Sequence, residues 1–296
     1  MHSHVVRPPV SLQQLFGRTP VGVAEREVDT QGSVGDIDAP VMPPISCAWF
    51  MLGSAAMVEI GLTANPDCIV LDRQHGLWER VALEAAVGIA RHHVPVVVRV
   101  ADHTPGAIAE ALDAGACSAM VPMVETAEQA EAAVSASRYP PVGTRSAGGV
   151  RPLLGGTRVM REDGAWSSVG AMIETRRGVE NVEAIAAVPG LAYLFIGTGD
   201  LAMSHGDYRD LEQGDRPELK ARVDADCLRV LRAAHANGKP CGIFTTRLDD
   251  AVAQWRNGFD WVVACSDIDA ARKSIVHACT SMDEARKAAD VSGDGE

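Results

Sequence analysis

Residues 94–124 read VPVVVRVADHTPGAIAEALDAGACSAMVPMV, and this stretch decides the fold. It contains two apolar runs, 94–100 and 118–124, which are short and continuous, as strands buried on both faces are. Between them, 104–114 has helical spacing, opens with a Thr-Pro pair and closes at Gly115. A strand, a helix and a second strand in succession predict a parallel pair joined by a helical crossover.

The same alternation runs through most of the chain. Further apolar runs of this kind lie at 46–52, 67–71, 168–173, 191–196, 240–245 and 259–265. Further helical patterns lie at 79–93, 126–138, 177–187, 217–237 and 247–257. Eight strand–helix units in a row predict an α/β fold, a (β/α)8 TIM barrel over residues 46–290. The alternative is an open, doubly wound sheet.

Three segments fall outside this alternation. Residues 1–45 form an irregular N-terminal extension with a short helix expected in SLQQLFG, and 17–44, rich in Gly, Pro and Asp, are expected to be loop or partly disordered. Residues 291–296 form a short tail. The glycine-rich stretch 138–166 is long for a barrel connection, and such loops are usually lids or binding loops.

Composition narrows the classes of partner. Of 296 residues 47% are apolar, which is enough for a large core, and the net charge of −12 argues against binding to nucleic acids or anionic membranes. No apolar stretch reaches membrane-spanning length, and the start MHSHVVRPPV lacks the apolar region of a signal peptide. The seven cysteines form no C-x-x-C motif and mostly lie in apolar runs, as buried reduced thiols do. We therefore expect a cytoplasmic protein.

Polar side chains collect where the predicted strands end, which is where barrel enzymes build their sites. Asp72 and Arg99 stand at the ends of the second and third strands, and His75 follows on the next loop. Glu174 and Asp200 follow the neighbouring fifth and sixth strands at matching depth. Two carboxylates this close repel each other unless a cation lies between them, and such a pair suits Mg²⁺ or Mn²⁺, with Co²⁺ and Zn²⁺ as alternatives.

Structural interpretations of these residues remain open at this point. Glu174 can instead pair with Arg99 or Arg176, and Asp200 can simply cap the turn that follows it. His75 can be structural, or it can act as a base near neutral pH if a carboxylate orients its ring. Arg99 can form an ion pair across the barrel, or it can stabilise an oxyanion.

Two other mechanisms are disfavoured. The stretch LFIGTGDLAMSHG at 194–206 has the G-x-G-x-x-A spacing of a dinucleotide-phosphate turn, but it places Asp200 where the pyrophosphate would lie. A Schiff-base aldolase needs a lysine in its pocket, and none of the four lysines falls at the carboxyl end of a predicted strand. Carbonyl chemistry in this chain would therefore rely on a metal.

Six stretches between about residues 47 and 270 carry a resemblance to a known family: VLDRQHGLWE, VPVVVRV, DAGACSAMVPMVETAEQAE, RYPPVGTRSAGG, MIETRRGVENVEAIAAVPGL and FIGTGDLAMSHG. In this order and spacing the chain resembles the HpcH/HpaI aldolases, which are metal-dependent pyruvate aldolases. The resemblance implies a lyase that makes or cleaves 4-hydroxy-2-keto acids, with pyruvate and an aldehyde as small-molecule partners, through a pyruvate enolate held at a divalent metal. It also implies a homo-oligomer, often a hexamer.

The resemblance further implies roles for individual residues. Glu174 and Asp200 match the metal ligands. His75 matches the catalytic histidine and Asp72 its acidic partner, and Arg99 matches the arginine that steadies the enolate.

Substrate binding is expected to involve further residues. The turn at Thr198 and Gly199 matches the one that binds the substrate carboxylate, and we expect Arg145 to face the aldehyde end. Gln74 is also expected at the substrate. The chain departs from the family pattern at three places: Gln74 stands where the family commonly has Glu, Met172 stands where it often has Gln, and G-T-G-D-L replaces the usual G-P-A-D-L. These departures favour an altered substrate choice or a different reaction on the same enolate. The alternatives are a CoA-ester lyase of the citrate-lyase or malyl-CoA type, which needs a basic channel, and a non-catalytic barrel that binds a metal or ligand.

Overall fold

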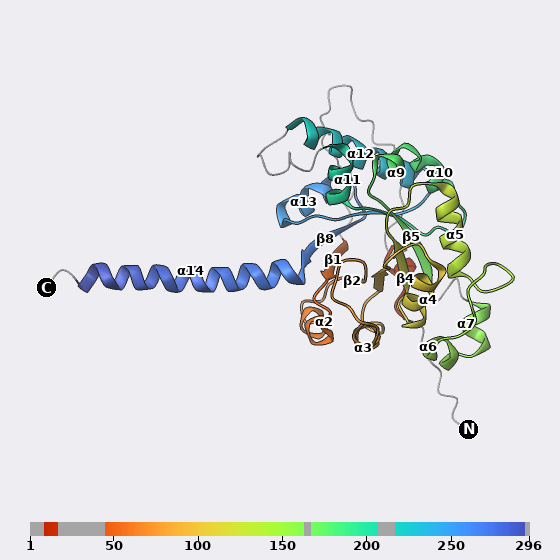
Figure 1. Cartoon of the computed structure of the whole chain (residues 1–296), viewed down its shortest axis with the longest axis horizontal. Coiled ribbons are helices and arrows are strands. Elements are labelled where there is room, and N and C mark those ends of the chain that lie inside the picture. The colour runs from red at the N-terminus through yellow and green to blue at the C-terminus, as the bar shows by residue number, and fades with distance from the viewer. Residues whose placement is uncertain (1–8, 17–44, 163–166, 207–216, 294–296) are drawn as a thin grey trace.

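The computed structural model describes residues 9–16, 45–162, 167–206 and 217–293, with side chains up to 287. Eight parallel strands pair in chain order and close into a barrel (Figure 1). They are β1 (Ile45–Phe50), β2 (Cys68–Asp72), β3 (Val96–Arg99), β4 (Ser118–Val121), β5 (Ser168–Ile173), β6 (Leu194–Ile196), β7 (Cys241–Ile243) and β8 (Trp261–Ser266). The predicted (β/α)8 barrel is confirmed, and the pairing of β1 with β8 rules out an open sheet.

Helices surround this barrel (Figure 1). They are α1 (Leu12–Phe16), α2 (Ala55–Leu62), α3 (Arg80–Ala90), α4 (Pro105–Asp113), α5 (Ala127–Ser137), α6 (Val150–Leu154), α7 (Thr157–Arg161), α9 (Arg176–Glu180), α10 (Val182–Ala187), α11 (Thr198–His205), α12 (Pro217–Ala236), α13 (Leu248–Arg256) and α14 (Asp267–Gly293). The pattern expected as one helix at 177–187 is divided into α9 and α10, which meet at Asn181.

The decisive stretch folds as its residues require. The Thr104 hydroxyl accepts a hydrogen bond from the Ala107 N–H at 3.3 Å, Pro105 occupies the first turn of α4, and Gly115 ends the helix at φ +92°. These caps fix both ends of a helix only nine residues long, so β3 and β4 meet as parallel neighbours.

Side chains alternate between the two faces of each strand, and this alternation positions the site. On β2, Ile69 and Leu71 pack in the layer between barrel and helices, whereas Cys68 and Val70 fill the barrel interior. Asp72 is the next member of the interior series. The same parity points Arg99, two residues after Val97, and Glu174, two residues after Met172, into the barrel at its carboxyl end.

Helix α1 closes the amino end of the barrel. Leu12 and Phe16 are buried in the interior cluster, and the Phe16 ring meets Trp261 edge-on with centroids 6.0 Å apart. The short helix expected in SLQQLFG is therefore present. The loop expected at 17–44 lies outside the described residues.

The glycine-rich stretch after α5 is the segment expected to be a lid or a binding loop. Its described part contains the short helices α6 and α7, and the Arg151 side chain of α6 donates to the carbonyl of Glu84 at 2.6 Å and to that of Ala114. Ala114 ends α4 just before the residues that lead into β4, at the amino end of the barrel, whereas Glu84 lies within α3. The stretch is therefore fastened at the end opposite the carboxyl rim, so its described residues do not form a lid over that rim, and the binding-loop alternative stays a prediction.

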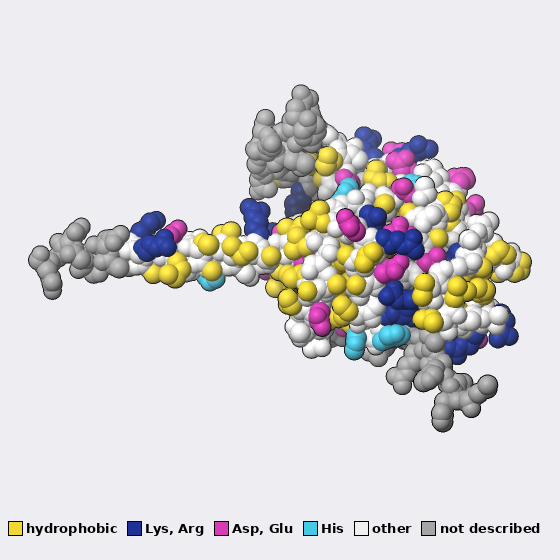
Figure 2. Space-filling model, turned by 60° about the horizontal axis from the view of Figure 1, so that its bottom comes forward, with side chains coloured by type: hydrophobic (Ala, Val, Ile, Leu, Met, Phe, Trp, Pro, Cys, Tyr) yellow, Lys and Arg dark blue, Asp and Glu magenta, His cyan; other side chains and the backbone are white. Residues whose placement is uncertain are grey.

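Helix α14 projects from the barrel instead of folding back on it (Figure 1). Its first residue, Asp267, accepts hydrogen bonds from the N–H groups of Met51 and Leu52, both at 2.9 Å, which ties the start of the helix to the end of β1. Ile275, Val276 and Met282 farther along are 64%, 55% and 60% exposed, and Figure 2 shows apolar side chains along the helix.

The cysteines and the helices also bear on two expectations from the sequence, reduced buried thiols and the lack of a membrane-spanning segment. All seven cysteines are free thiols, five of them buried, as expected of most, while Cys265 and Cys279 are exposed. In the described part of the chain, no helix combines the length and apolar character that crossing a membrane requires.

Candidate active site

An ion pair at the ends of β2 and β3 forms the first half of the site. Asp72 and Arg99 are direct neighbours in the strand register, and their side chains are almost completely buried. The Arg99 Nε donates to Asp72 Oδ1 at 2.8 Å, and Nη2 donates to Oδ2. This two-point pairing holds the guanidinium plane in one orientation at the rim.

Further donors complete the coordination of the Asp72 carboxylate. The Trp49 Nε1–H donates to Oδ2 at 3.3 Å, and the backbone N–H groups of Gln74 and His75 donate to Oδ1 at 3.1 and 3.2 Å. The Trp49 ring also lies against the guanidinium, with Arg99 Cζ 5.1 Å from the ring centroid. Asp72 is therefore a buried charge with all its partners present.

The expectation that Asp72 orients the imidazole of His75 needs correction. The carboxylate accepts from the backbone N–H of His75, because the chain turns directly after β2, and its charge is taken up by Arg99. The His75 side chain is exposed at the rim, and its ring has no hydrogen-bond partner among the described residues.

Glu174 forms the second half of the site and differs from Asp72. Its side chain follows β5 and is completely buried. Oε1 accepts from the Met123 N–H at 2.7 Å, but Oε2 is buried without a hydrogen-bond partner among the described residues. Met123 has φ +53°, a conformation that costs free energy for a residue other than glycine and is common at functional sites.

Asp200 lies beside Glu174 in the first turn of α11. Burial raises the pKa of Glu174 to about 7, and the negative charge of Asp200 acts in the same direction, against the Met123 N–H and Arg99. Gly197 makes this arrangement possible, because a Cβ there would lie 2.3 Å from Glu174 Oε2. The glycine of the G-T-G-D stretch thus makes room for a carboxylate.

The two carboxylates fit a divalent cation. The buried Oε2 of Glu174 has no hydrogen-bond partner among the described residues and can coordinate a cation, and Asp200 supplies a second carboxylate next to it. Within the described residues, no three His, Cys, Asp or Glu side chains gather into a fuller site. Magnesium-like ions are commonly bound in this way, through one or two carboxylates plus oxygens from substrate and water. The alternative partner of Glu174, Arg99, forms its hydrogen bonds with Asp72 instead.

The remaining rim residues surround this group. Gln74 is half-buried, and its Oε1 is a buried atom without a hydrogen-bond partner in the described chain. The Met172 sulfur lies 3.8 Å from Arg99 Nη1. Thr198 donates from Oγ1 to the Phe244 carbonyl at 3.0 Å, and Gly199 is exposed in the first turn of α11.

The structure does not bring Arg145 to this rim, which corrects the expectation that it faces an aldehyde. Its Nη2 donates to Asp113 Oδ1 at 2.8 Å, and its Cζ lies 4.7 Å from the centre of the Tyr139 ring. Arg145 lines a cavity with Gly115 and Ser167, the residues that lead into β4 and β5, so it lies at the amino end of the barrel.

Two contributors to the site were not identified from the sequence. Trp49 lies within an apolar strand run, and nothing in that run distinguishes a residue that binds Asp72 from one that only packs. Met123 acts through its backbone N–H, so the identity of its side chain carries no signal. The positive φ that aims this N–H at Glu174 is visible only in three dimensions.

The chain folds into a closed (β/α)8 barrel, and its carboxyl rim carries an oriented guanidinium and two carboxylates. These are the features of a barrel enzyme. The chain belongs to the HpcH/HpaI aldolase/citrate lyase family, whose model matches residues 46–274. The resemblance stated from the sequence is thereby confirmed.

Individual relatives agree. The chain is 36% identical over 245 residues to a hydroxypyruvate/pyruvate aldolase of Chromohalobacter salexigens, covering 77% of this chain and 89% of that protein. It is 37% identical over 215 residues to a 4-hydroxy-2-oxovalerate aldolase of Novosphingobium aromaticivorans, covering 71% and 79%. A crystal structure of a family member from Burkholderia cenocepacia matches with a TM-score of 0.71 at 31% identity, covering 81% and 94%. The chain is therefore a lyase of the aldolase type.

Proposed function

We propose that this protein is a divalent-metal-dependent aldolase that makes or cleaves 4-hydroxy-2-keto acids, with pyruvate as the keto-acid partner. The observation that carries the proposal is the buried, unpartnered Oε2 of Glu174 beside Asp200, in the same rim as the oriented Arg99. Curated relatives named pyruvate and 4-hydroxy-2-oxovalerate aldolases support the substrate class.

Each part of the site has a task in this reaction. Glu174 and Asp200 hold the cation, which when bound supplies Lewis-acid polarisation of the keto acid's oxygens. Arg99, fixed by Asp72 and Trp49, stabilises the negative charge that grows on the keto oxygen. In the direction of cleavage, a base takes the proton of the C4 hydroxyl, the C3–C4 bond breaks, and the electron pair passes into the enolate as the aldehyde leaves.

Proton transfer at C3 falls to His75. Its exposed imidazole at the rim returns a proton to C3 of the enolate, directly or through a water, and removes it in the reverse direction. The first turn of α11, at Thr198 and Gly199, offers backbone N–H groups to the substrate carboxylate. Gln74, whose Oε1 has no hydrogen-bond partner among the described residues, accepts a hydrogen bond from substrate in this proposal.

Enolisation tests this function without knowledge of the aldehyde. Protein, pyruvate and Mg²⁺, Mn²⁺, Co²⁺ or Zn²⁺ are incubated in D₂O, and loss of the methyl proton signal is followed by NMR. We expect metal-dependent exchange that EDTA stops reversibly and that Glu174→Gln abolishes. Glu183→Gln, an exposed carboxylate paired with Arg229, serves as the matched control. Exchange that survives EDTA and Glu174→Gln alike would contradict the proposal, and cleavage of a CoA ester without pyruvate exchange would favour the citrate-lyase type.

We further propose that the protein is a cytoplasmic homo-oligomer, with a hexamer as the family-based expectation. The seven free thiols support a reducing compartment. Helix α14 extends away from its own barrel with Ile275, Val276 and Met282 exposed, and a second copy of the chain would cover this surface. Light scattering on the full chain tests this: Ile275→Glu with Val276→Glu should lower the molar mass, and a wild-type monomer would contradict it.

A further inference from the structure

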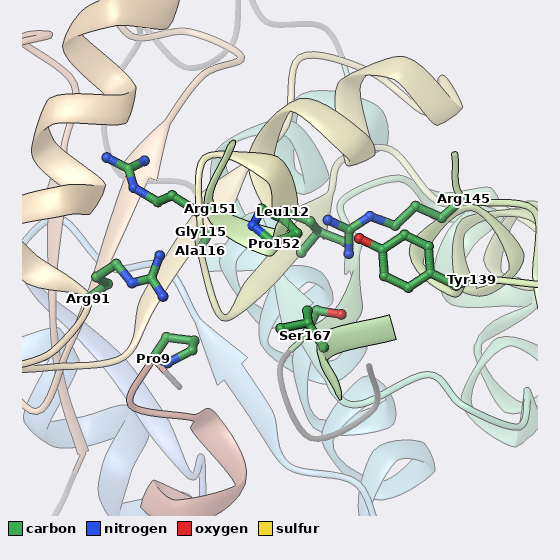
Figure 3. A pocket seen from close by; sticks show the side chains of 11 residues that line it. Pro9, Arg91, Leu112, Gly115, Ala116, Tyr139, Arg145, Arg151, Pro152 and Ser167 are labelled. Carbon is green, nitrogen blue, oxygen red and sulfur yellow. The ribbon is translucent and has the colours of Figure 1, made fainter. Parts of the chain in front are cut away.

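A cavity at the amino end of the barrel lies on the far side from the rim that carries Asp72 and Glu174. The space between its lining residues amounts to about 380 Å³, a figure that includes space open to solvent. Three arginines, Arg91, Arg145 and Arg151, line it, and none of its lining residues is acidic (Figure 3). Such a concentration of positive charge in one cavity of an acidic protein requires an explanation.

Arg91 is the central feature of this cavity. It follows α3, is 7% exposed, and its side chain reaches toward the middle of the cavity (Figure 3). Its Nε is buried without a hydrogen-bond partner, and the structure shows no acceptor or carboxylate for the guanidinium among the described residues. Burial lowers the pKa of Arg91, and the charge of Arg151 lowers it further. A buried charge without a partner is strongly unfavourable unless an ion of opposite charge accompanies it.

Arg151 adds a second positive charge, which no carboxylate offsets within the described part of the chain. Its guanidinium donates to the backbone carbonyls of Ala114 and Glu84, which are neutral acceptors. Gly115 allows the two arginines to approach, because a Cβ at this position would lie 2.4 Å from Arg91 Nη1 and 2.8 Å from Arg151 Cδ.

In the same cavity, the positive charge of Arg145 is compensated by a carboxylate. Its guanidinium donates to Asp113 Oδ1 at 2.8 Å and lies over the Tyr139 ring. The nearby Glu84 carboxylate is also engaged, with exposed Arg80 at 3.0 Å. Among the residues that the structure describes, the nearby carboxylates Asp113 and Glu84 are therefore paired with other arginines, and the charges of Arg91 and Arg151 remain for an external anion.

We propose that this cavity is a binding site for a phosphate group, held by Arg91 with Arg151 adjacent, separate from the catalytic rim. Two uncompensated positive charges match the charge of a phosphate dianion, and guanidinium groups bind phosphate oxygens with paired N–H donors. Because Arg91 follows α3 and Arg151 belongs to α6, a bound phosphate links the glycine-rich stretch to the barrel.

Binding of inorganic phosphate to the full chain tests the proposal. Calorimetric titration and thermal unfolding are compared in phosphate and in chloride at matched ionic strength. We expect phosphate to bind at millimolar concentration or tighter and to raise the unfolding temperature, and saturating pyruvate not to displace it. Arg91→Met should weaken binding by about tenfold or more, while its unfolding temperature without phosphate stays level or rises, because a buried uncompensated charge is removed.

Further variants keep the test decisive. Arg91→Lys retains a buried charge without the paired donors, so we expect it to fold and to bind phosphate several times more weakly than wild type. Arg229→Met, which removes an exposed arginine paired with Glu183, should bind like wild type. Glycerol 3-phosphate distinguishes a phosphorylated metabolite from the free ion, since tighter binding of either supports the site. Unchanged binding in Arg91→Met, displacement by pyruvate, or a preference for succinate over phosphate would overturn it.

Discussion

Asp72 and Glu174 are two completely buried carboxylates at the same rim, but they differ in the hydrogen-bond donors and charges around them. Asp72 receives a guanidinium, an indole N–H and two backbone N–H groups. Glu174 receives one backbone N–H, and the neighbouring Asp200 adds to its electrostatic cost. A carboxylate with all its partners orients another group, whereas one that lacks a counter-charge is available to bind a cation.

The largest effect is expected from removing the incomplete carboxylate. Glu174→Gln or Asp200→Asn should lower the rate of metal-dependent pyruvate exchange by roughly a thousandfold, because the proposed cation site would lose one of its two carboxylates. The fold should remain intact, as judged by circular dichroism. EDTA should reproduce the loss in wild type, and added metal should reverse it. A variant with exchange close to wild type would show that Glu174 and Asp200 do not hold the metal.

The complete carboxylate should matter for stability as well as for activity. Arg99→Met leaves Asp72 buried without its cation, and breaking a buried pair from one side costs about 3 to 5 kcal/mol. Glu174→Gln, by contrast, should not lower the free energy of unfolding of the metal-free protein. Urea denaturation of both variants measures the difference. Equal losses in the two variants would remove the distinction drawn between Asp72 and Glu174.

The pH dependence of stability should distinguish the two groups further. The pKa of Glu174 rises from 4.5 to about 7 on folding, so between these values the folded state holds a proton that the unfolded state has released. The stability of the metal-free protein should therefore fall as pH rises through this window, by about 3 kcal/mol once pH exceeds 7. Glu174→Gln should flatten this dependence. Thermal melts between pH 5 and pH 8 provide the measurement, and an equal slope in the variant would assign the effect to other groups.

The smallest effect is expected at Gln74. Its backbone N–H supports Asp72, and this contact survives any side-chain change, so Gln74→Glu should leave the fold unaltered. The added negative charge at the rim should change the metal preference or shift the exchange rate by less than about tenfold. Rates with Mg²⁺, Mn²⁺ and Co²⁺ give the comparison. An identical profile would show that this departure from the family is neutral.

The fold was more predictable from the sequence than the chemistry of individual side chains. Continuous apolar runs identify strands buried on both faces, and Thr104, Pro105 and Gly115 mark helix ends by local geometry alone. Asp72, Arg99 and Glu174 could be placed at one rim because parallel strands end together. The partners of these side chains could not be assigned from the sequence. Asp72 has Arg99 opposite it on the neighbouring strand and His75 three residues later in the chain, and only the structure shows that its partner is Arg99.

Long connections were the least predictable part. Nothing in the sequence indicates whether an arginine after α5 turns toward the carboxyl rim or toward the amino end. Arg145 turns toward the amino end because Asp113, far away in sequence, lies there to pair with it. Contacts of this kind depend on the completed barrel, and local patterns do not contain them.

The register of β2 and β3 has one further consequence. Asp72 and Arg99 are opposite each other only in the observed alignment, and a slip of one residue would set Val98 against Asp72 and turn Arg99 toward the helices. Such a misassembled barrel would leave two charges stranded in apolar surroundings. The pair that orients the Arg99 guanidinium thus also favours the correct strand alignment, because a chain with the wrong alignment has a less stable folded state.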